Sequence, residues 1–494
     1  MTMKRRSYIW PAVFVLCVAA AAQAQVDTQP FRRQLQQIER ETQALIQRQV
    51  PPEQRALVDY GGFVSFNFLA IDDAVQETHI LRQTLVTGYA LVNIDGVHEF
   101  FIRGSSRYDD FNDGDAFDTH GDDWIEPTLD RGVYRFDLKR YYEVNEGQTI
   151  NGNLVIEGGR QLVHWANGLV LSEEIDGGQV TVEIDRLAIT ALAGRTRTSN
   201  VDIDSSRPEF AGDMRRGFYG GMLSYQATPR HRPFVYVFVQ EDENNNKPLL
   251  TDVAGTPADL TDDVITEFEY DSHYIGFGSE GSFGDRLSYG VEVVYQGGEG
   301  LSNSIASTGD QLVQTHEDIE AYAADFRLDY LFADANRTRL SGEVLIASGD
   351  SDRMTTTNTF GGNKSGTDDQ AFNAFGLINA GLAFNPNVSN LLMFRAGAST
   401  FPLPNCPLFR RFQVGTNVFV FNKMNTSGPT DEEIIGSERT NDRFLGYETD
   451  FYVNWQLTSD LAWTFRYGVF FPGTGVPGDS DPRHFGFTGI TFAF

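Results

Sequence analysis

The feature that most constrains the fold is an alternation with a period of two residues, which runs through most of the chain after residue 56. In segment 461–471, apolar and aromatic side chains occupy every second position, and polar or small side chains occupy the positions between them. Segments 320–332, 287–296 and 133–139 repeat the pattern. Because successive side chains of a β-strand point to opposite faces, each segment is predicted to be a strand with one apolar face.

The direction of the apolar face separates two fold classes. A soluble β-sandwich would turn that face inward, whereas a membrane β-barrel turns it toward lipid. The length of the segments, the aromatic residues at strand ends and the charges on the other face favour the barrel. The mean hydropathy of −0.31 and the lack of an apolar run of about 18 residues exclude a protein that crosses a membrane with helices.

Connection lengths provide a second test of the barrel. About eighteen strands are expected, and they begin near residues 57, 79, 96, 132, 150, 161, 178, 214, 232, 266, 286, 315, 336, 376, 389, 445, 460 and 484. Short turns are expected at 93–96, 228–232, 281–285, 333–336, 385–390 and 458–460. Long loops are expected at about 108–131, 195–213, 242–265, 299–314, 349–375 and 402–444. Short periplasmic turns and long outer loops are typical of outer-membrane barrels. The predicted fold class is all-β: a transmembrane antiparallel β-barrel of about 18 strands, with a short N-terminal helix.

The N-terminal residues have the pattern of an export signal. Basic residues at positions 4–6 precede an uncharged stretch over 9–22, and Ala22-Gln23-Ala24 supplies a small-x-small cleavage site. Residues 1–24 are therefore predicted to be a cleaved signal peptide, which directs the chain to the cell outer membrane. One of the two cysteines lies in this leader, so only Cys406 survives processing and the exported chain has no internal disulfide.

Residues 25–55 are predicted to form an N-terminal periplasmic helical segment, and residues 56–494 the outer-membrane barrel. Within 31–50, four apolar side chains share one helical face, namely Phe31, Leu35, Ile38 and Leu45. Pro51-Pro52 ends the helix, which is marginal alone at this length. Its functional interpretations are oligomerisation, a cover for the barrel mouth and binding of a periplasmic partner. A partly frayed helix is the plain alternative.

The C-terminal segment 484–494 is predicted to be the closing strand. Ile490, Phe492 and the terminal Phe494 share one face, and a closing strand with a terminal aromatic is the usual signal for the barrel-assembly machinery. Phe485 and Phe487 lie in the opposite phase. We attribute this phase break to a β-bulge at Gly489.

Three stretches have a recognisable order and spacing over about 150–360. The first comprises Gly158-Gly159-Arg160-Gln161, Gly168-Leu169-Val170 and residues 182–187. The second comprises Tyr270-Asp271, residues 274–276, residues 287–292 and Gln296-Gly297. The third is Ala347-Ser348-Gly349-Asp350 with Thr359-Phe360 after it, at a strand end before a long loop. Together they resemble the alginate-export outer-membrane proteins, and the strand pattern extends the likeness over 56–494.

The resemblance implies a monomeric barrel of about 18 strands that passes a polyanionic polysaccharide through an arginine-rich lumen. The charge departs from the electropositive pathway of that family, because 39 Lys+Arg against 68 Asp+Glu give a net charge of −29. This excess acid also argues against a nucleic-acid partner. Much of the acid falls in 108–131 and 242–271, which are predicted to be extracellular, whereas many basic residues lie within strands. A basic constriction below an acidic rim is therefore expected.

Basic side chains on the polar strand faces are the candidate substrate contacts. A charge that faces lipid near the bilayer midplane costs roughly 2–4 kcal/mol, so these side chains are expected to point inward. There an Arg offers fixed donors for carboxylate or sulfate groups. The predicted lumen residues are Arg103, Arg135, Lys139, Arg327, Arg395 and Arg466, with Arg160 and Arg186 added from the family resemblance. The alternative is that each Arg pairs with a lumen acid such as Asp137, Asp325, Asp329 or Glu343 and only braces the wall.

Other chemical motifs are sparse. Asp113, Asp115 and Asp118 form an oxygen-rich loop of the kind that Ca²⁺ prefers, with a solvated acidic loop as the alternative. Gly276-Phe-Gly278-Ser-Glu-Gly281 precedes a strand instead of opening a helix, so it is rejected as a dinucleotide site. The eight His lack metal-ligand spacing, and the sequence has no Gly-x-Ser-x-Gly elbow. No other cofactor and no enzyme activity are predicted.

The expected function is a passive outer-membrane channel for anionic polysaccharide or charged small solutes, with Arg and Lys side chains giving the selectivity. Two other interpretations stay open: a less selective diffusion porin, and a structural anchor or adhesin that uses segment 31–50. The expected partners are outer-membrane lipid, the transported solute, the barrel-assembly machinery and a periplasmic partner of 31–50.

Overall fold

The structure is a computed structural model that describes residues 56–494, except for 74–76, 117–121, 198–199, 209, 211–213, 246, 253–262, 307–308, 357, 431–439 and 479–480. The predicted signal peptide and N-terminal helix lie outside the described residues. The first nine strands are β1 (Ala56–Asp72), β2 (Thr78–Ile94), β3 (His98–Phe111), β4 (Asp123–Asp137), β5 (Gly152–His164), β6 (Ser172–Ile184), β7 (Leu187–Thr196), β8 (Arg216–Tyr225) and β9 (His231–Asp242). The later wall strands are β12 (Tyr270–Phe283), β13 (Leu287–Leu301), β14 (His316–Leu331), β15 (Arg339–Ala347), β16 (Leu391–Thr400), β17 (Phe412–Lys423), β18 (Phe444–Gln456), β19 (Leu461–Pro472) and β20 (Arg483–Ala493).

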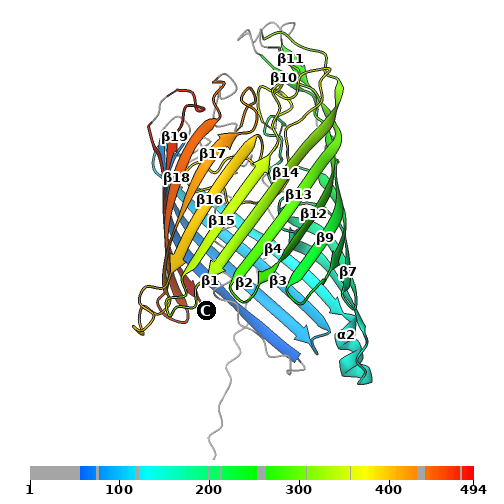
Figure 1. Cartoon of the computed structure of the whole chain (residues 1–494), viewed down its shortest axis with the longest axis vertical. Helices are drawn as coiled ribbons and strands as arrows, with labels where there is room; N and C mark the ends of the chain where they lie inside the picture. The colour runs from blue at the N-terminus through cyan, green and yellow to red at the C-terminus, as the bar shows by residue number, and fades with distance from the viewer. Residues whose placement is uncertain are drawn as a thin grey trace, which may run out of the picture.

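These 18 strands form one antiparallel sheet that closes on itself (Figure 1). Strand β1 pairs with β2 on one side and with β20 on the other, so the first and last strands complete the cylinder. The predicted transmembrane β-barrel is therefore confirmed. β10 (Leu249–Thr251) and β11 (Val264–Thr266) form a separate hairpin beyond the wall. α2 (Leu138–Tyr141) and η1 (Tyr142–Glu146) follow β4, and no helix among the described residues is long and apolar enough to cross a membrane.

The two ends of the barrel differ, as the connection lengths predict. Short turns join the strands at the end where β1 begins and β20 ends, and the longer connections gather at the other end (Figure 1). We call these the short-turn end and the long-loop end. The connections over 138–151, which holds α2 and η1, and over 401–411 are exceptions, since both are long for the short-turn end.

The outer face is apolar, as the alternation predicts. On β14, Tyr322, Phe326 and Leu328 are exposed, whereas Ala323 and Asp325 between them are buried. The same division holds on β13, where Tyr295 is exposed while Glu292 and Gln296 on the other face are fully buried. In a single-layer closed sheet an exposed apolar band is stable only against lipid, and the alternating side chains face the lumen.

Two element predictions between 349 and 444 are wrong. The strand expected at 376 and the turn expected at 385–390 belong to one long connection between β15 and β16, and the strand β17 was missed inside the long loop expected over 402–444. Residues 371–384 carry many apolar side chains because they pack inside the barrel, which imitates a strand. The errors cancel, so the expected total of eighteen agrees with the 18 wall strands.

Two further corrections concern phase and boundaries. The strands expected at 161 and 178 begin later, at 172 and 187, because residues 165–171 form a connection instead of continuing the ladder. The bulge predicted at Gly489 is absent from the described ladders, since β20 pairs in unbroken register with both β19 and β1. Phe485 and Phe487 simply point inward, where they pack with Leu69 and Leu81.

Candidate functional site

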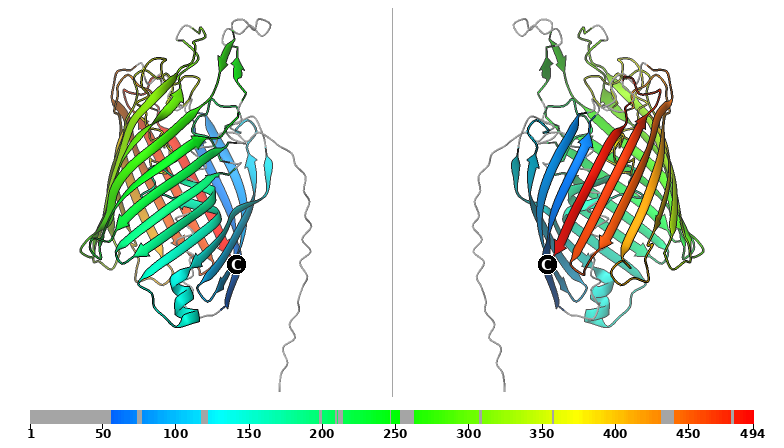
Figure 2. Two further views of the ribbon diagram at one scale, coloured as in Figure 1. Left: turned by 90° about the vertical axis from the view of Figure 1, so that its right-hand side faces the viewer. Right: turned by 90° about the vertical axis from the view of Figure 1, so that its left-hand side faces the viewer.

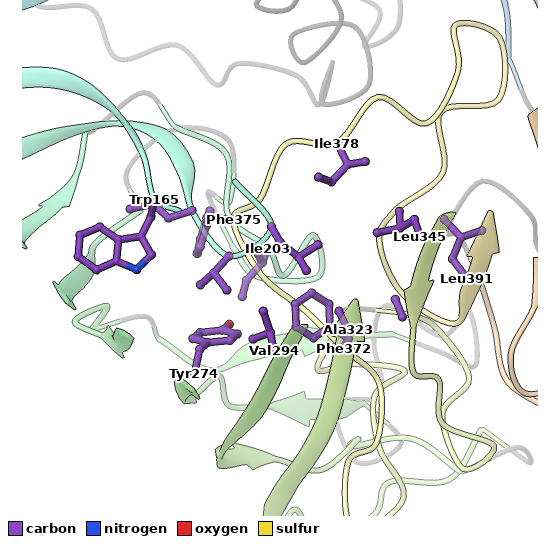
Figure 3. Close-up of a cluster of buried hydrophobic side chains, with 14 of the residues drawn as sticks. Trp165, Ile203, Tyr274, Val294, Ala323, Leu345, Phe372, Phe375, Ile378 and Leu391 are labelled. Carbon is purple, nitrogen blue, oxygen red and sulfur yellow. The ribbon is translucent and has the colours of Figure 1, made fainter. Parts of the chain in front are cut away.

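The barrel interior is divided by the long connection between β15 and β16, residues 348–390, which we call the inturned loop. Phe372, Phe375 and Phe384 of this loop are buried. The Phe375 ring packs edge-on against Phe218 of β8, with 5.4 Å between centroids. The Phe384 ring stacks on Phe470 of β19 at 4.2 Å. The loop therefore crosses the lumen from the β8 side to the β19 side, and Figure 3 shows its apolar residues among side chains of the wall.

Backbone hydrogen bonds close the base of the inturned loop and attach it to β14, where the N–H of Ser348 donates to the Tyr322 carbonyl at 2.9 Å. The Ser348 carbonyl accepts from the N–H of Phe372 at 3.1 Å and from that of Asn390 at 2.9 Å. Gly349 lies so close to Asn390 that an added Cβ would be 2.2 Å from its side chain. These contacts give a structural reason for the Ser-Gly-Asp motif at this strand end. The next residue, Asp350, is buried, and burial raises the pKa of its carboxyl with help from the nearby Asp369.

A second segment, residues 165–171 between β5 and β6, also folds inward and supports the loop. Trp165, Leu169 and Leu171 are buried in the same apolar cluster as the loop phenylalanines. The N–H of Leu377 donates to the Gly168 carbonyl at 3.0 Å, and the N–H of Ser172 donates to the Phe375 carbonyl at 2.8 Å. The two inturned segments therefore pack as one unit.

Three polar side chains of the wall hold these segments in place. Glu448 of β18 accepts the N–H groups of Leu382, Ala383 and Phe384, the last two at 2.8 Å. Glu292 of β13 accepts the N–H of Asn167 at 3.1 Å. Gln296 of β13 accepts the N–H of Asn373 at 2.9 Å. Glu448 therefore holds three backbone N–H groups of the inturned loop, whereas Glu292 and Gln296 each hold one backbone N–H.

Next to these contacts, inward-facing charges of β14, β15 and β16 form a compact ion-pair group. Arg327 lies 2.6 Å from Asp325 and 3.9 Å from Glu343, and Arg395 pairs with Glu343. Arg327 also donates to the Asn167 carbonyl at 2.8 Å. These arginines therefore brace the wall and the inturned unit, as the alternative interpretation of the sequence proposed.

The inner wall formed by β1–β4 and β20 carries a connected set of polar side chains beside the apolar cluster of Leu69, Leu81, Phe485 and Phe487. Ser65 and Thr491 hydroxyls lie 2.8 Å apart. Asn67 donates to Gln83, which donates to Asp109 at 2.9 Å, and Arg107 lies 3.1 Å from Asp109. We call this set the polar strip; its members are Ser65, Asn67, Gln83, Thr87, Arg107, Asp109 and Thr491.

Five of the predicted lumen residues lie on inward-facing ladder positions. Arg103 contacts Asp130 at 3.4 Å, and Arg135 contacts Glu157 at 3.1 Å. Arg327 and Arg395 belong to the ion-pair group described above. Arg466 of β19 lies over the Tyr452 ring, with 5.0 Å from its guanidinium carbon to the centroid. The structure does not bring the five together at one constriction.

Three of the predicted lumen residues are placed differently. Lys139 is not on a strand, because β4 ends at Asp137 and Lys139 lies in α2 at the short-turn end. Arg186 lies in the turn between β6 and β7, where the preceding Asp185 has a φ of 54°. Arg160 pairs with Asp176, four residues along the ladder from the exposed pair Ile156↔Val180, so it lies on the same outer face of the sheet.

The acidic loop after β3 gives no metal-binding group within the described residues, where no three His, Cys, Asp or Glu side chains are arranged to hold an ion. Asp118 lies outside the described residues. The Asp115 carboxylate already has a structural contact, because it accepts the N–H of Ile80 at 3.1 Å. The calcium prediction therefore stays a prediction.

The sequence did not single out Glu448 and Glu292, which bind the inturned segments, or Arg107 of the polar strip as functional candidates. Glu292 and Arg107 occupy the polar phase of alternating strands, so the period-two pattern does predict that they face inward. Which inward carboxylate would meet a loop does not follow from that pattern. An additional signal was available in Phe419, Phe421 and Phe470, which are apolar on the inward phase and need something apolar to cover them.

Comparison with known proteins adds two findings. A model of the alginate export family matches residues 134–483. None of the curated proteins compared with the chain matches it. Three crystal structures from Pseudomonas aeruginosa share its fold, each 10% identical with a TM-score of 0.50 and each covering 88% of this chain: OccK5 (OpdH) over 98% of its own length, OccK11 (OpdR) over 96%, and OpdK with vanillate over 98%. At that identity the likeness shows the fold alone.

Proposed function

The chain belongs to the alginate-export family, and we propose that it is a passive outer-membrane channel that admits anionic polysaccharide or charged small solutes along the polar strip. The family and the fold shared with outer-membrane channels point to a transport channel rather than an enzyme. The nature of the solute and the route through the lumen are the proposal.

One observation carries the route: the lumen has two unlike sides. Between β8 and β19, inward aromatic side chains such as Phe218, Phe419 and Phe470 are covered by the inturned loop. In the polar strip, the inward side chains are hydroxyls, amides and charged groups that bond one another. A hydrated solute finds hydrogen-bonding partners along the polar strip, whereas burial of its polar groups against the apolar cluster is costly.

Passage along the polar strip includes an opening step. Gln83 and Thr87 are buried in this structure, so some of the groups that line the lumen must move away from the strip for a solute to pass. Glu448 is the natural point of release, because three backbone N–H groups of the loop depend on its carboxylate. An anionic solute competes for the same N–H donors, which couples the presence of solute to the opening.

A second candidate solute class is a small carboxylate in place of a polymer. The described lumen arginines are already matched to carboxylates, for example Arg135 to Glu157 and Arg395 to Glu343. A lining of paired charges offers few unmatched arginines, which suits a compact anion better than a long polyanion. The OpdK crystal structure, which shares the fold, contains vanillate, an aromatic carboxylate.

Single-channel recording in planar bilayers tests the proposal. Oligouronates added to one side should block or occupy the open channel in a length-dependent manner, and vanillate should compete if small carboxylates use the same route. Arg107→Gln should weaken both effects, whereas Arg232→Gln, an exposed ion-paired residue near the short-turn end, should change neither. Currents indifferent to every anion would leave a non-selective diffusion porin.

A further inference from the structure

The barrel wall has a weak seam between β4 and β5. Their ladder holds only the pairs from Asp137↔Val155 to Gly132↔Arg160, whereas β5 and β6 pair over the whole of Gly152–His164. The first nine residues of β4, from Asp123 to Arg131, therefore have no partner in β5. In Figure 2 the light-blue and cyan hairpin of β3 and β4 leans away from the rest of the wall at the long-loop end.

Ion pairs across this seam join β3 and β4 to β6, although β3 and β6 are not neighbours in the sheet. Arg103 of β3 lies 3.6 Å from Glu174 of β6, and Arg131 of β4 lies 3.8 Å from the same carboxylate. Neighbouring strands are spaced by about 4.8 Å, so β3 and β6 would be about 14 Å apart in a flat sheet. The hairpin is therefore turned so that its charged side faces the outer surface of β5 and β6.

Five arginines meet at this point, and we call them the seam arginines: Arg103, Arg131, Arg160, Arg195 and Arg197. Arg197 lies 2.9 Å from Glu174, and Arg160 lies 2.7 Å from Asp176. Arg195 is the ladder partner of Asp176 and is exposed. Asp130 completes the set through its contact with Arg103 at 3.4 Å.

One carboxylate links most of the arginines at the seam. Glu174 is shared by three guanidinium groups, those of Arg103, Arg131 and Arg197. Asp130 also accepts hydroxyls from Ser105 and Thr128. The partly exposed Arg160 and the exposed Arg195 share one outward row with a single carboxylate, that of Asp176. Two accessible guanidiniums in one row suit an anion with more than one charge.

The position of the seam indicates which anion is available. Arg160, Asp176 and Arg195 occupy one outward row of the sheet. Exposed apolar side chains lie beside this row on the outer surface, including Ile102, Leu129 and Val180. The seam arginines therefore stand at the upper border of the lipid-facing band, next to the long loops, where charged residues meet headgroups and not acyl chains.

We propose that the seam arginines bind the phosphate headgroup of a glycolipid in the outer leaflet. Arginine suits this task because its planar guanidinium forms paired hydrogen bonds to phosphate oxygens. The exposed Arg195 and the partly exposed Arg160 would make the first contacts, and Arg197 would close the site from the β7 side. The bound headgroup would replace the missing backbone ladder between β4 and β5 with phosphate bridges, which gives the weak seam a stabilising partner.

Lipid binding to the purified, folded full-length barrel tests the proposal. Diphosphoryl lipid A in detergent is titrated against wild type and against Arg160→Gln with Arg195→Gln, and binding is followed by native mass spectrometry and by the thermal unfolding temperature. The double variant should bind about tenfold more weakly or worse, since each lost charge-assisted bond matters. Arg82→Gln is the matched control, because Arg82 is also an exposed arginine near the long-loop end and pairs with Asp110.

Two lipid probes make the result decisive. Lipid A without its phosphates should bind wild type no better than diphosphoryl lipid A binds the double variant. Equal affinity of wild type and the double variant for diphosphoryl lipid A would overturn the proposal, and so would an equal loss in Arg82→Gln. Heat-modified mobility on gels verifies that each variant is a closed barrel. Solute conductance is a separate measurement, so failure of the channel proposal leaves this result interpretable.

Discussion

The two sides of the lumen are built from strands of the same kind, yet they do opposite things. On the side from β8 to β19, inward phenylalanines such as Phe419 and Phe470 are fully buried under the inturned loop. On the side of β1–β4, inward residues such as Asn67 and Arg107 bond to other polar groups of the wall. The outer faces of both sides are apolar, so only the inward phase distinguishes them.

The difference shows how a barrel specifies an internal loop. Apolar side chains that face a wet lumen would be exposed to water, and their burial under a loop removes that cost. Strands that carry aromatics on both phases therefore require an internal partner, whereas strands with a polar inward phase do not. The closing strand β20 is an example, because Phe485 and Phe487 pack with Leu382 and Ala383 of the loop.

The largest expected effect comes from the apolar contacts of the loop. Phe372→Ala should cost about 3–5 kcal/mol of loop docking, because the ring is fully buried and leaves a cavity. The variant should show a larger single-channel current and faster hydrogen exchange over 371–384. Phe326→Ala, which removes an exposed ring on the lipid side of β14, should change neither. Similar exchange in both variants would contradict the packing described for the loop.

Next in size is the polar contact at β18. Glu448→Gln places an NH₂ donor where the N–H groups of residues 382–384 need an acceptor, so docking should weaken by about 1.5–3 kcal/mol. The expected result is a higher open probability at unchanged full conductance. Glu280→Gln is the control, since Glu280 pairs with Arg232 and touches no part of the loop that the structure describes. An open probability equal to wild type would show that Glu448 is not a latch.

A smaller effect is expected on the polar side. Arg107→Gln removes one positive charge from the strip, and the preference for anions over cations should fall by roughly twofold. The reversal potential in a salt gradient measures this change. Arg339→Gln removes a more exposed arginine that pairs with Asp329 near the short-turn end, and it should leave the reversal potential nearly unchanged. A larger shift in Arg339→Gln than in Arg107→Gln would place the selective region at the short-turn end.

The smallest effect concerns pH. Burial raises the pKa of Asp350 in the docked loop, whereas in a released loop this carboxyl titrates at its ordinary pKa of about 4. The docked loop therefore keeps its proton to a higher pH than the released loop does. Docking should therefore be strongest below that pH and should weaken as pH rises through the raised pKa. Protease cleavage of the loop should slow slightly on acidification in wild type. In Asp350→Asn that part of the pH dependence should disappear, and an unchanged profile would contradict it.

The sequence predicted the strands of the barrel wall better than the contacts inside the lumen. Alternation in 320–332 and 461–471 depends on lipid outside and polar groups inside, which is a local property, so strand faces followed directly. The inward direction of Arg103, Arg135 and Arg327 followed for the same reason. The partners of these side chains depend on how distant strands and the inturned loop meet, which no local pattern contains. The prediction that Arg160 faces the lumen came from the family resemblance, which names the residue but not the face of the sheet on which it lies.

The most direct test of the account asks which side of the lumen a permeating anion touches. Cys406 is the sole cysteine that the structure describes, so single cysteines can be placed in a Cys406→Ser background. A negatively charged thiosulfonate reagent should modify Asn67→Cys and Arg107→Cys in the open channel and reduce the current. It should leave Ala323→Cys and Leu345→Cys, which lie beneath the inturned loop, unmodified. Rapid modification of the second pair with protection of the first would contradict a path along the polar strip.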